Sequence, residues 1–181
     1  MVRIFTTLAI FALAMVAAAL VLGLYLGDIH GKRDVDTLRL ATIHRLLGIG
    51  AAIVVALVDS IAVTYFIGTS RWCKEVSEAY GLEPELAGKS ARLKRRNFPW
   101  SLISILVVIG VGALGAAADP ATVRPGTESW VIVHLLGALA GFAFIALAFF
   151  IQGQRIAANH AVIEEIMAQV RRIREERGLE V

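Results

Sequence analysis

Four ionisable side chains interrupt stretches that are otherwise apolar: His44, Arg45, Asp59 and His134. If such a stretch crosses a membrane, an Asp or Arg at its centre costs about 2.5–3.5 kcal/mol on insertion scales, so ionisable residues there tend to be retained for a function. These four residues are therefore the first candidates for a site.

The two histidines can carry a specific chemistry together. At 100° per residue, His44 shares a helix face with Gly48, and His134 shares one with Gly137 and Gly141. Faces made of small residues turn toward other helices. Counted from the nearest charged residues, His44 lies roughly 7–8 Å and His134 roughly 9 Å inside the same edge of the membrane. Both imidazoles should therefore point into a helix bundle at one depth.

Two imidazoles facing each other from different helices can hold a haem iron from both sides, which makes a low-spin, electron-carrying centre. On this hypothesis the nearby glycines leave room for the porphyrin of a haem b, and Arg45 pairs with a propionate. Three alternatives remain open. Each histidine can simply hydrogen-bond a neighbouring helix while Arg45 reaches the surface, or the pair can bind a quinone or a metal ion. A metal ion needs three or four ligands and no HxxxH spacing supplies them, although His30 is a further polar partner nearby.

Asp59 forms a separate candidate. It follows His44 by 15 residues, which is roughly 22 Å along a helix, so the two residues cannot share a site. Asp59 could handle a proton or a cation. The simpler interpretation pairs it with an arginine or with a hydroxyl such as that of Ser101 or Ser104. No other span carries a carboxylate, which argues against a transporter.

The elements that position these residues follow from composition. Hydrophobic residues make up 57% of the 181 residues and charged residues 18%, against about 45–50% and 25% in soluble domains. A spanning helix needs about 20 apolar residues, and four runs qualify: residues 4–26, 40–67, 98–118 and 129–151. The first run could also be a signal peptide, but its apolar stretch is longer than the usual core. The sequence predicts an all-α, polytopic membrane protein whose four transmembrane helices form an up-down bundle.

Lysines and arginines predict the orientation. Residues 70–97 contain seven of them, the segment after residue 152 contains five, and Arg3 adds one, whereas the two other connections contain four. Because the cytoplasmic side carries the excess, we expect a multi-pass protein of a plasma (inner) membrane with both termini in the cytoplasm. The same bias explains the formal charge of +3 without a nucleic-acid partner.

Two segments should extend beyond the bilayer. We divide the chain into spans 1–69, a cytoplasmic helical loop 70–97, spans 98–152 and a helical tail 153–181. In the loop, Ser70 should begin one helix that ends at Gly81, Pro84 should begin a second, and Pro99 should begin the third span. The tail should continue the fourth span through Gly153. It carries an apolar stripe that predicts either a homodimer or packing on the loop: Ile163, Ile166, Val170 and Ile173.

Motifs of soluble enzymes are missing from the sequence, including GxSxG, the P-loop and HExxH. The single cysteine, Cys73, excludes a disulfide within one chain and predicts a free thiol. We therefore expect a membrane-embedded, non-catalytic subunit or binding protein, with other membrane subunits as its partners. A b-type haem electron-transfer protein is the alternative.

Overall fold

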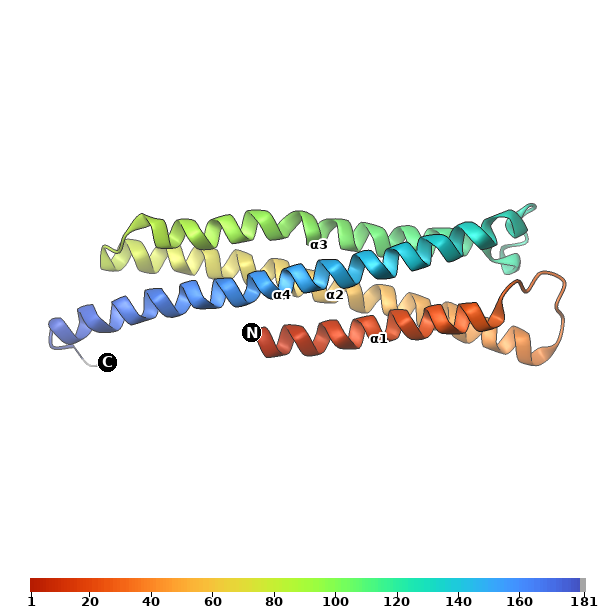
Figure 1. Ribbon diagram of the computed structural model, residues 1–181, viewed down its shortest axis with the longest axis horizontal. Coiled ribbons are helices and arrows are strands. Elements are labelled where there is room, and N and C mark those ends of the chain that lie inside the picture. Colours follow the sequence, from red (N-terminus) through yellow and green to blue (C-terminus); the bar gives the residue numbers. More distant parts are fainter. Residues whose placement is uncertain (180–181) are drawn as a thin grey trace.

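The computed structural model describes residues 1–179, and this part of the chain is a bundle of four long helices (Figure 1). They are separated by a short loop, by a tight turn and by a connection that contains two 3₁₀ turns, η1 (Pro120–Thr122) and η2 (Thr127–Trp130). The prediction of an all-α bundle of four helices is confirmed. The last two residues of the predicted tail lie outside the described part. In chain order the helices are α1 (Val2–Leu26), α2 (Val35–Tyr80), α3 (Pro84–Ala118) and α4 (Val131–Glu176).

The bundle has two distinct ends. The α1–α2 and α3–α4 connections lie together at one end, which we call the loop end (Figure 1). The α2–α3 turn lies at the other, which we call the turn end, and α1 and α4 have their free ends in that direction. Since α1 has 25 residues and α2 and α4 have 46 each, α2, α3 and α4 continue toward the turn end beyond α1.

All four helices are long and apolar enough to cross a membrane. Their outward faces carry large hydrophobic side chains that are more than half exposed, such as Ile10, Leu57, Ile109 and Phe150. Exposed apolar area on this scale is unfavourable in water. In a bilayer the same side chains contact lipid, so the surface agrees with a multi-pass membrane protein.

Local signals explain where the helices begin and end. The Asp34 carboxylate accepts a hydrogen bond from the Thr37 amide at 2.8 Å and caps α2. Gly81 ends α2 in the left-handed conformation at φ 65°, which costs glycine little. Pro84 occupies the first turn of α3, where its missing N–H has no intrahelical partner to lose.

Two predicted helix starts are wrong. Ser70 lies buried in the middle of α2, and Pro99 lies inside α3. The predicted loop helices are therefore continuations of α2 and α3 toward the turn end. Proline removes one backbone donor and crowds the preceding turn, and near this break the Arg155 guanidinium donates to the carbonyl oxygen of Arg96. A side chain from α4 thus contacts the backbone of α3 three residues before Pro99.

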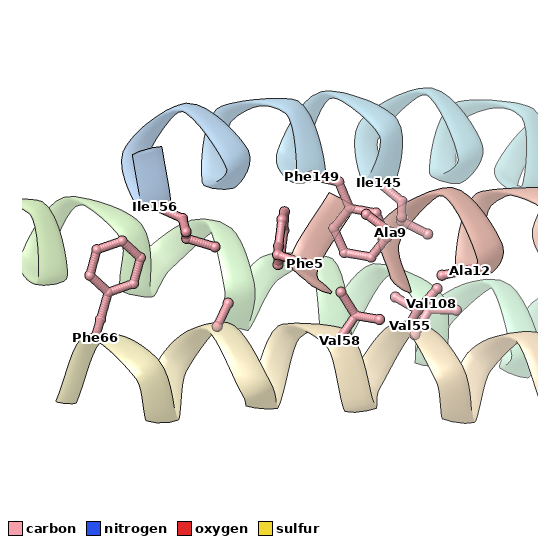
Figure 2. Packing of buried hydrophobic residues seen from close by; sticks show 11 residues of the cluster. Phe5, Ala9, Ala12, Val55, Val58, Phe66, Val108, Ile145, Phe149 and Ile156 are labelled. Carbon is pink, nitrogen blue, oxygen red and sulfur yellow. The ribbon is translucent and has the colours of Figure 1, made fainter. Parts of the chain in front are cut away.

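The main core lies midway along the bundle, where all four helices meet (Figure 2). The rings of Phe5 on α1 and Phe149 on α4 pack edge to face with centroids 6.1 Å apart. Val55 and Val58 from α2 and Val108 from α3 complete the contact (Figure 2). These side chains hold the first pair of helices against the second.

The C-terminal part of α4 packs on α2 and α3. Ile166 is fully buried and Val170 nearly so, against Cys73 on α2 and Leu86 on α3. The middle of the apolar stripe of the tail is thus covered within the chain, and Ile163 packs partly against the same cluster. Cys73 is a free thiol, and burial raises its pKa.

Candidate ligand site between two helical hairpins

The molecule consists of two similar helical hairpins, α1–α2 and α3–α4. The inward-facing positions of α2 recur 90 residues later on α4, and those of α1 recur 92 residues later on α3. In α2 and α4 the matching buried positions are Ala51, Val55, Val58, Asp59, Ala62 and Phe66, followed by Gly141, Ile145, Ala148, Phe149, Gln152 and Ile156. In α1 and α3 they are Phe5, Ala9, Ala12 and Leu26, followed by Asn97, Ser101, Ser104 and Ala118.

The two histidines occupy matching positions in this repeat. His44 packs against Gly23 of its own hairpin, and His134 packs against Gly115 of the other. A Cβ atom on Gly23 would lie 2.9 Å from Cε1 of His44, and one on Gly115 would lie 3.0 Å from Cε1 of His134. The first distance is too short for a Cβ and the second is tighter than an ordinary contact, so each glycine leaves space for an imidazole ring.

The two rings face each other between the hairpins. Their centroids are 6.3 Å apart and their planes are inclined at 71°. The two histidines therefore lie at one depth, as counting residues from the helix edges predicts. No direct hydrogen bond joins the two rings within residues 1–179.

The hydrogen bonds of His44 define its tautomer. Its Nδ1 atom lies 3.0 Å from the carbonyl oxygen of Ala19, and a carbonyl only accepts, so Nδ1 carries the proton. The Nε2 atom of a neutral His44 then carries a free lone pair. His134 is arranged similarly: the matching carbonyl, that of Val111, faces it, although its buried Nδ1 makes no hydrogen bond of good geometry. A backbone acceptor at Nδ1 is the usual support of a metal-binding imidazole.

Packing is loose around the histidines. No residue of α2 from 42 to 50, and none of α4 from 131 to 140, is buried, whereas the helices become tightly packed from Ala51 and Gly141 onward. Gly48, one turn from His44, has open space where a Cβ would stand. The helices are therefore only partly buried against one another at the level of the two rings.

Polar contacts, rather than an apolar core, join the two hairpins at this end. Arg45 donates through Nη1 to both carboxylate oxygens of Asp119 at 3.0 Å. His30 bonds to Asp28 at 2.6 Å and to the Thr127 hydroxyl at 2.8 Å. The hydrogen bonds that the His30 backbone and ring make to Asp28 lower the pKa of that carboxyl. Arg45 and His30 thus connect the hairpins beside the histidine pair.

The separation of the rings selects among kinds of ligand. A metal–nitrogen bond measures about 2.0–2.1 Å, so two imidazoles on opposite sides of one ion have ring centres about 6.3 Å apart, whereas tetrahedral ligation brings them to about 5.2 Å. The observed 6.3 Å matches the linear arrangement. Within the described residues, no group of three or more His, Cys, Asp or Glu side chains could hold a metal ion. The same 6.3 Å, with planes inclined at 71°, also lies within the range of an ordinary edge-to-face contact between two rings.

Asp59 belongs to a separate polar network deeper in the bundle. It is fully buried and accepts a hydrogen bond from Nε2 of Gln152 at 2.7 Å. The amide oxygen of Gln152 accepts from Ser101 at 3.0 Å, and Ser101 accepts from Asn97 at 3.2 Å. The second oxygen of Asp59 has the Ser104 hydroxyl as its neighbour but makes no hydrogen bond of good geometry. The serines of α3 are thus part of the network, while its main partner comes from α4.

A second polar group continues this network toward the turn end. Asn159 accepts from Ser90 at 2.7 Å and donates to Thr69 at 2.9 Å and to Tyr65 at 3.2 Å. In the matching positions of the repeat, Asp59 and Gln152 correspond to Phe149 and Ala62. One side of the bundle interior is therefore polar and its counterpart apolar, which distinguishes the two hairpins.

Several of these residues were not predicted as partners, namely Gly23, Gly115, Asp119, Gln152 and Asn159. A signal for the two glycines is nonetheless present, because Leu22-Gly23 and Leu114-Gly115 stand in matching places near the ends of their helices. These glycines stand out only when the two hairpins are compared. The repeat between the hairpins is clear in the pattern of buried positions rather than in residue identities.

No protein-family model, curated protein or solved structure matches this chain.

Proposed function

We propose that the chain binds a b-type haem between its two hairpins, with His44 and His134 as axial ligands, and that it carries electrons as a subunit of a membrane assembly. The observation that supports the proposal most is the 6.3 Å between the two ring centroids, which is the spacing of two imidazoles on one iron. A bound haem would supply a one-electron centre, and the protein would fix its axial ligands and its depth in the membrane.

Three further features support the proposal. The protonated Nδ1 of His44 leaves Nε2 free to coordinate. Gly23 and Gly115 leave space for the two rings, and the helix segments around the rings are only partly buried. Arg45 lies one residue from His44 at the loop end, where a propionate would compete with or share its contact to Asp119.

A quinone fits the same residues less well. Quinone carbonyl oxygens accept hydrogen bonds, whereas Nε2 of His44 in this tautomer is itself an acceptor. The small outer connections and the absence of enzyme motifs in the sequence favour a role as a binding or electron-carrying subunit over an enzyme of its own. We further propose the plasma membrane as its location, with both termini in the cytoplasm, from the distribution of lysine and arginine.

Absorbance of the purified protein tests the haem proposal. Protein isolated in detergent from haem-replete cells should show a Soret band and low-spin bands on reduction. His44→Ala and His134→Ala should each abolish low-spin haem, because one axial ligand is lost.

The chain provides a matched control in His160, which lies on the C-terminal part of α4 away from the pair. His160→Ala should retain the spectrum of the unmodified protein. A colourless unmodified protein, or an unchanged spectrum in both His44→Ala and His134→Ala, would contradict the proposal.

A further inference from the structure

A pocket opens between α2 and α3 at the border of their apolar segments. Its volume is about 390 Å³ and its walls include Val63, Phe66, Ile67 and Phe98. Ile67 and Phe98 end and begin the apolar runs of their helices, and both are more than half exposed. The pocket therefore lies where the hydrocarbon of a membrane would meet its headgroups.

Two cations stand at the same pocket. Lys94 and Arg95 line it on the α3 side, and neither forms an ion pair within residues 1–179. Their neighbours differ: Lys89 pairs with Glu165 at 3.3 Å, and Arg92 pairs with Glu85 at 2.7 Å. Among the described residues, Lys94, Arg95 and Arg96 of the basic run make no ion pair, and the first two of these line the pocket.

A buried polar atom adds to this arrangement. Asn97 lines the pocket and is 1% exposed, and its Oδ1 atom makes no hydrogen bond within the described residues. Its Nδ2 atom is already used on Ser101. An unpartnered buried acceptor is costly, so a ligand with a hydroxyl or amine donor in its headgroup would relieve it.

We propose that this pocket binds an anionic phospholipid of the adjoining leaflet, such as phosphatidylglycerol. Lys94 and Arg95 contact the phosphate, Asn97 accepts from the headgroup hydroxyl, and an acyl chain lies along Ile67, Phe98 and Val63. Charge complementarity and the position of the pocket on the apolar border favour a lipid over a soluble ligand. The site is independent of the histidine pair, which lies toward the opposite end of the bundle.

Native mass spectrometry of the full chain in detergent tests the site, after incubation with phosphatidylglycerol or with phosphatidylcholine of the same acyl chains. The unmodified protein should retain phosphatidylglycerol preferentially. The double variant Lys94→Gln/Arg95→Gln should lose about tenfold or more of that binding, because each cation near the surface contributes to holding an anionic lipid.

Two variants sharpen the test. Arg33→Gln/Arg39→Gln removes two cations that make no ion pair at the loop end and should leave retention unchanged. Ile67→Trp fills the pocket but keeps both cations, and should also reduce retention. Equal retention of both lipids, full retention in Ile67→Trp, or displacement by inorganic phosphate regardless of acyl chain would overturn the proposal.

Discussion

At the scale of single residues, two glycines determine where the imidazoles lie. Gly23 and Gly115 each face the Cε1 edge of a histidine, and a Cβ would lie 2.9 Å and 3.0 Å from that edge. The ring therefore occupies space that any other residue would fill. Each histidine position consequently depends on a residue of the neighbouring helix as well as on its own helix.

We predict that Gly23→Ala and Gly115→Ala displace the imidazole and destabilise the protein by about 1–3 kcal/mol through overpacking. The higher helix propensity of alanine relative to glycine offsets up to about 1 kcal/mol of this destabilisation. If haem is bound, both variants should shift its low-spin spectrum. Thermal unfolding in detergent and absorbance measure the two effects.

Gly112→Ala is the matched control, because it lies on α3 near Gly115 and has open space at its Cβ position. It should be neutral or slightly stabilising. Equal behaviour of Gly112→Ala and Gly115→Ala would mean that the contact with His134 does not constrain the ring.

Much of the polar interior could be identified from the sequence, but its pairing could not. His44, His134 and Asp59 stand out because ionisable groups are rare in apolar runs. Gln152 directly follows the fourth apolar run, and its contact with Asp59 depends on how α2 and α4 are aligned. That alignment is set by packing across helices that are 93 residues apart at this contact, and no local pattern encodes it.

At the scale of elements, the C-terminal part of α4 serves as a packing surface within the chain. Ile166 is surrounded by neighbouring side chains and is 0% exposed to solvent, whereas the adjacent Met167 is 39% exposed. Because the two residues are adjacent on α4, substituting each of them compares a buried with an exposed position at the same place along the helix.

Ile166→Ala should cost about 2–5 kcal/mol, because it leaves a cavity between α4, Cys73 and Leu86. Met167→Ala should cost much less. Hydrogen exchange of residues 156–176 measures the change, which should appear as faster exchange in that segment. If the tail instead formed an interchain coiled coil, the loss would depend on protein concentration, and concentration-independent exchange separates the two cases.

The extents of the apolar runs predicted the four helices, while two of their boundaries were mispredicted. A serine or a proline after an apolar run often marks a helix start, and Ser70 and Pro99 were interpreted in this way. In the structure, Ser70 is buried and Pro99 is accommodated within α3. Tertiary contacts with α4 therefore stabilise α2 beyond Ser70 and α3 on both sides of Pro99, where the local sequence alone would favour a helix boundary.

At the scale of the whole molecule, the even number of helices brings the free ends of α1 and α4 to the same side (Figure 1). We predict that a reporter fused within the turn at residues 81–83 faces the cytoplasm, and that one placed at residues 121–124 faces the opposite compartment. Alkaline phosphatase and fluorescent-protein fusions should therefore give complementary signals at the two positions. Phosphatase activity from the 81–83 fusion would reverse the proposed orientation.

The repeat of the two hairpins bears on how a protein of this architecture can arise in evolution. A protein of half this length, pairing with a second copy of itself, would place one histidine from each copy on opposite sides of the twofold axis, so a single histidine position would form the pair. Fusion of two such genes would then free each half to diverge. The carboxyl and amide on one side of the interior, opposite phenylalanine and alanine on the other, are the mark that such divergence would leave.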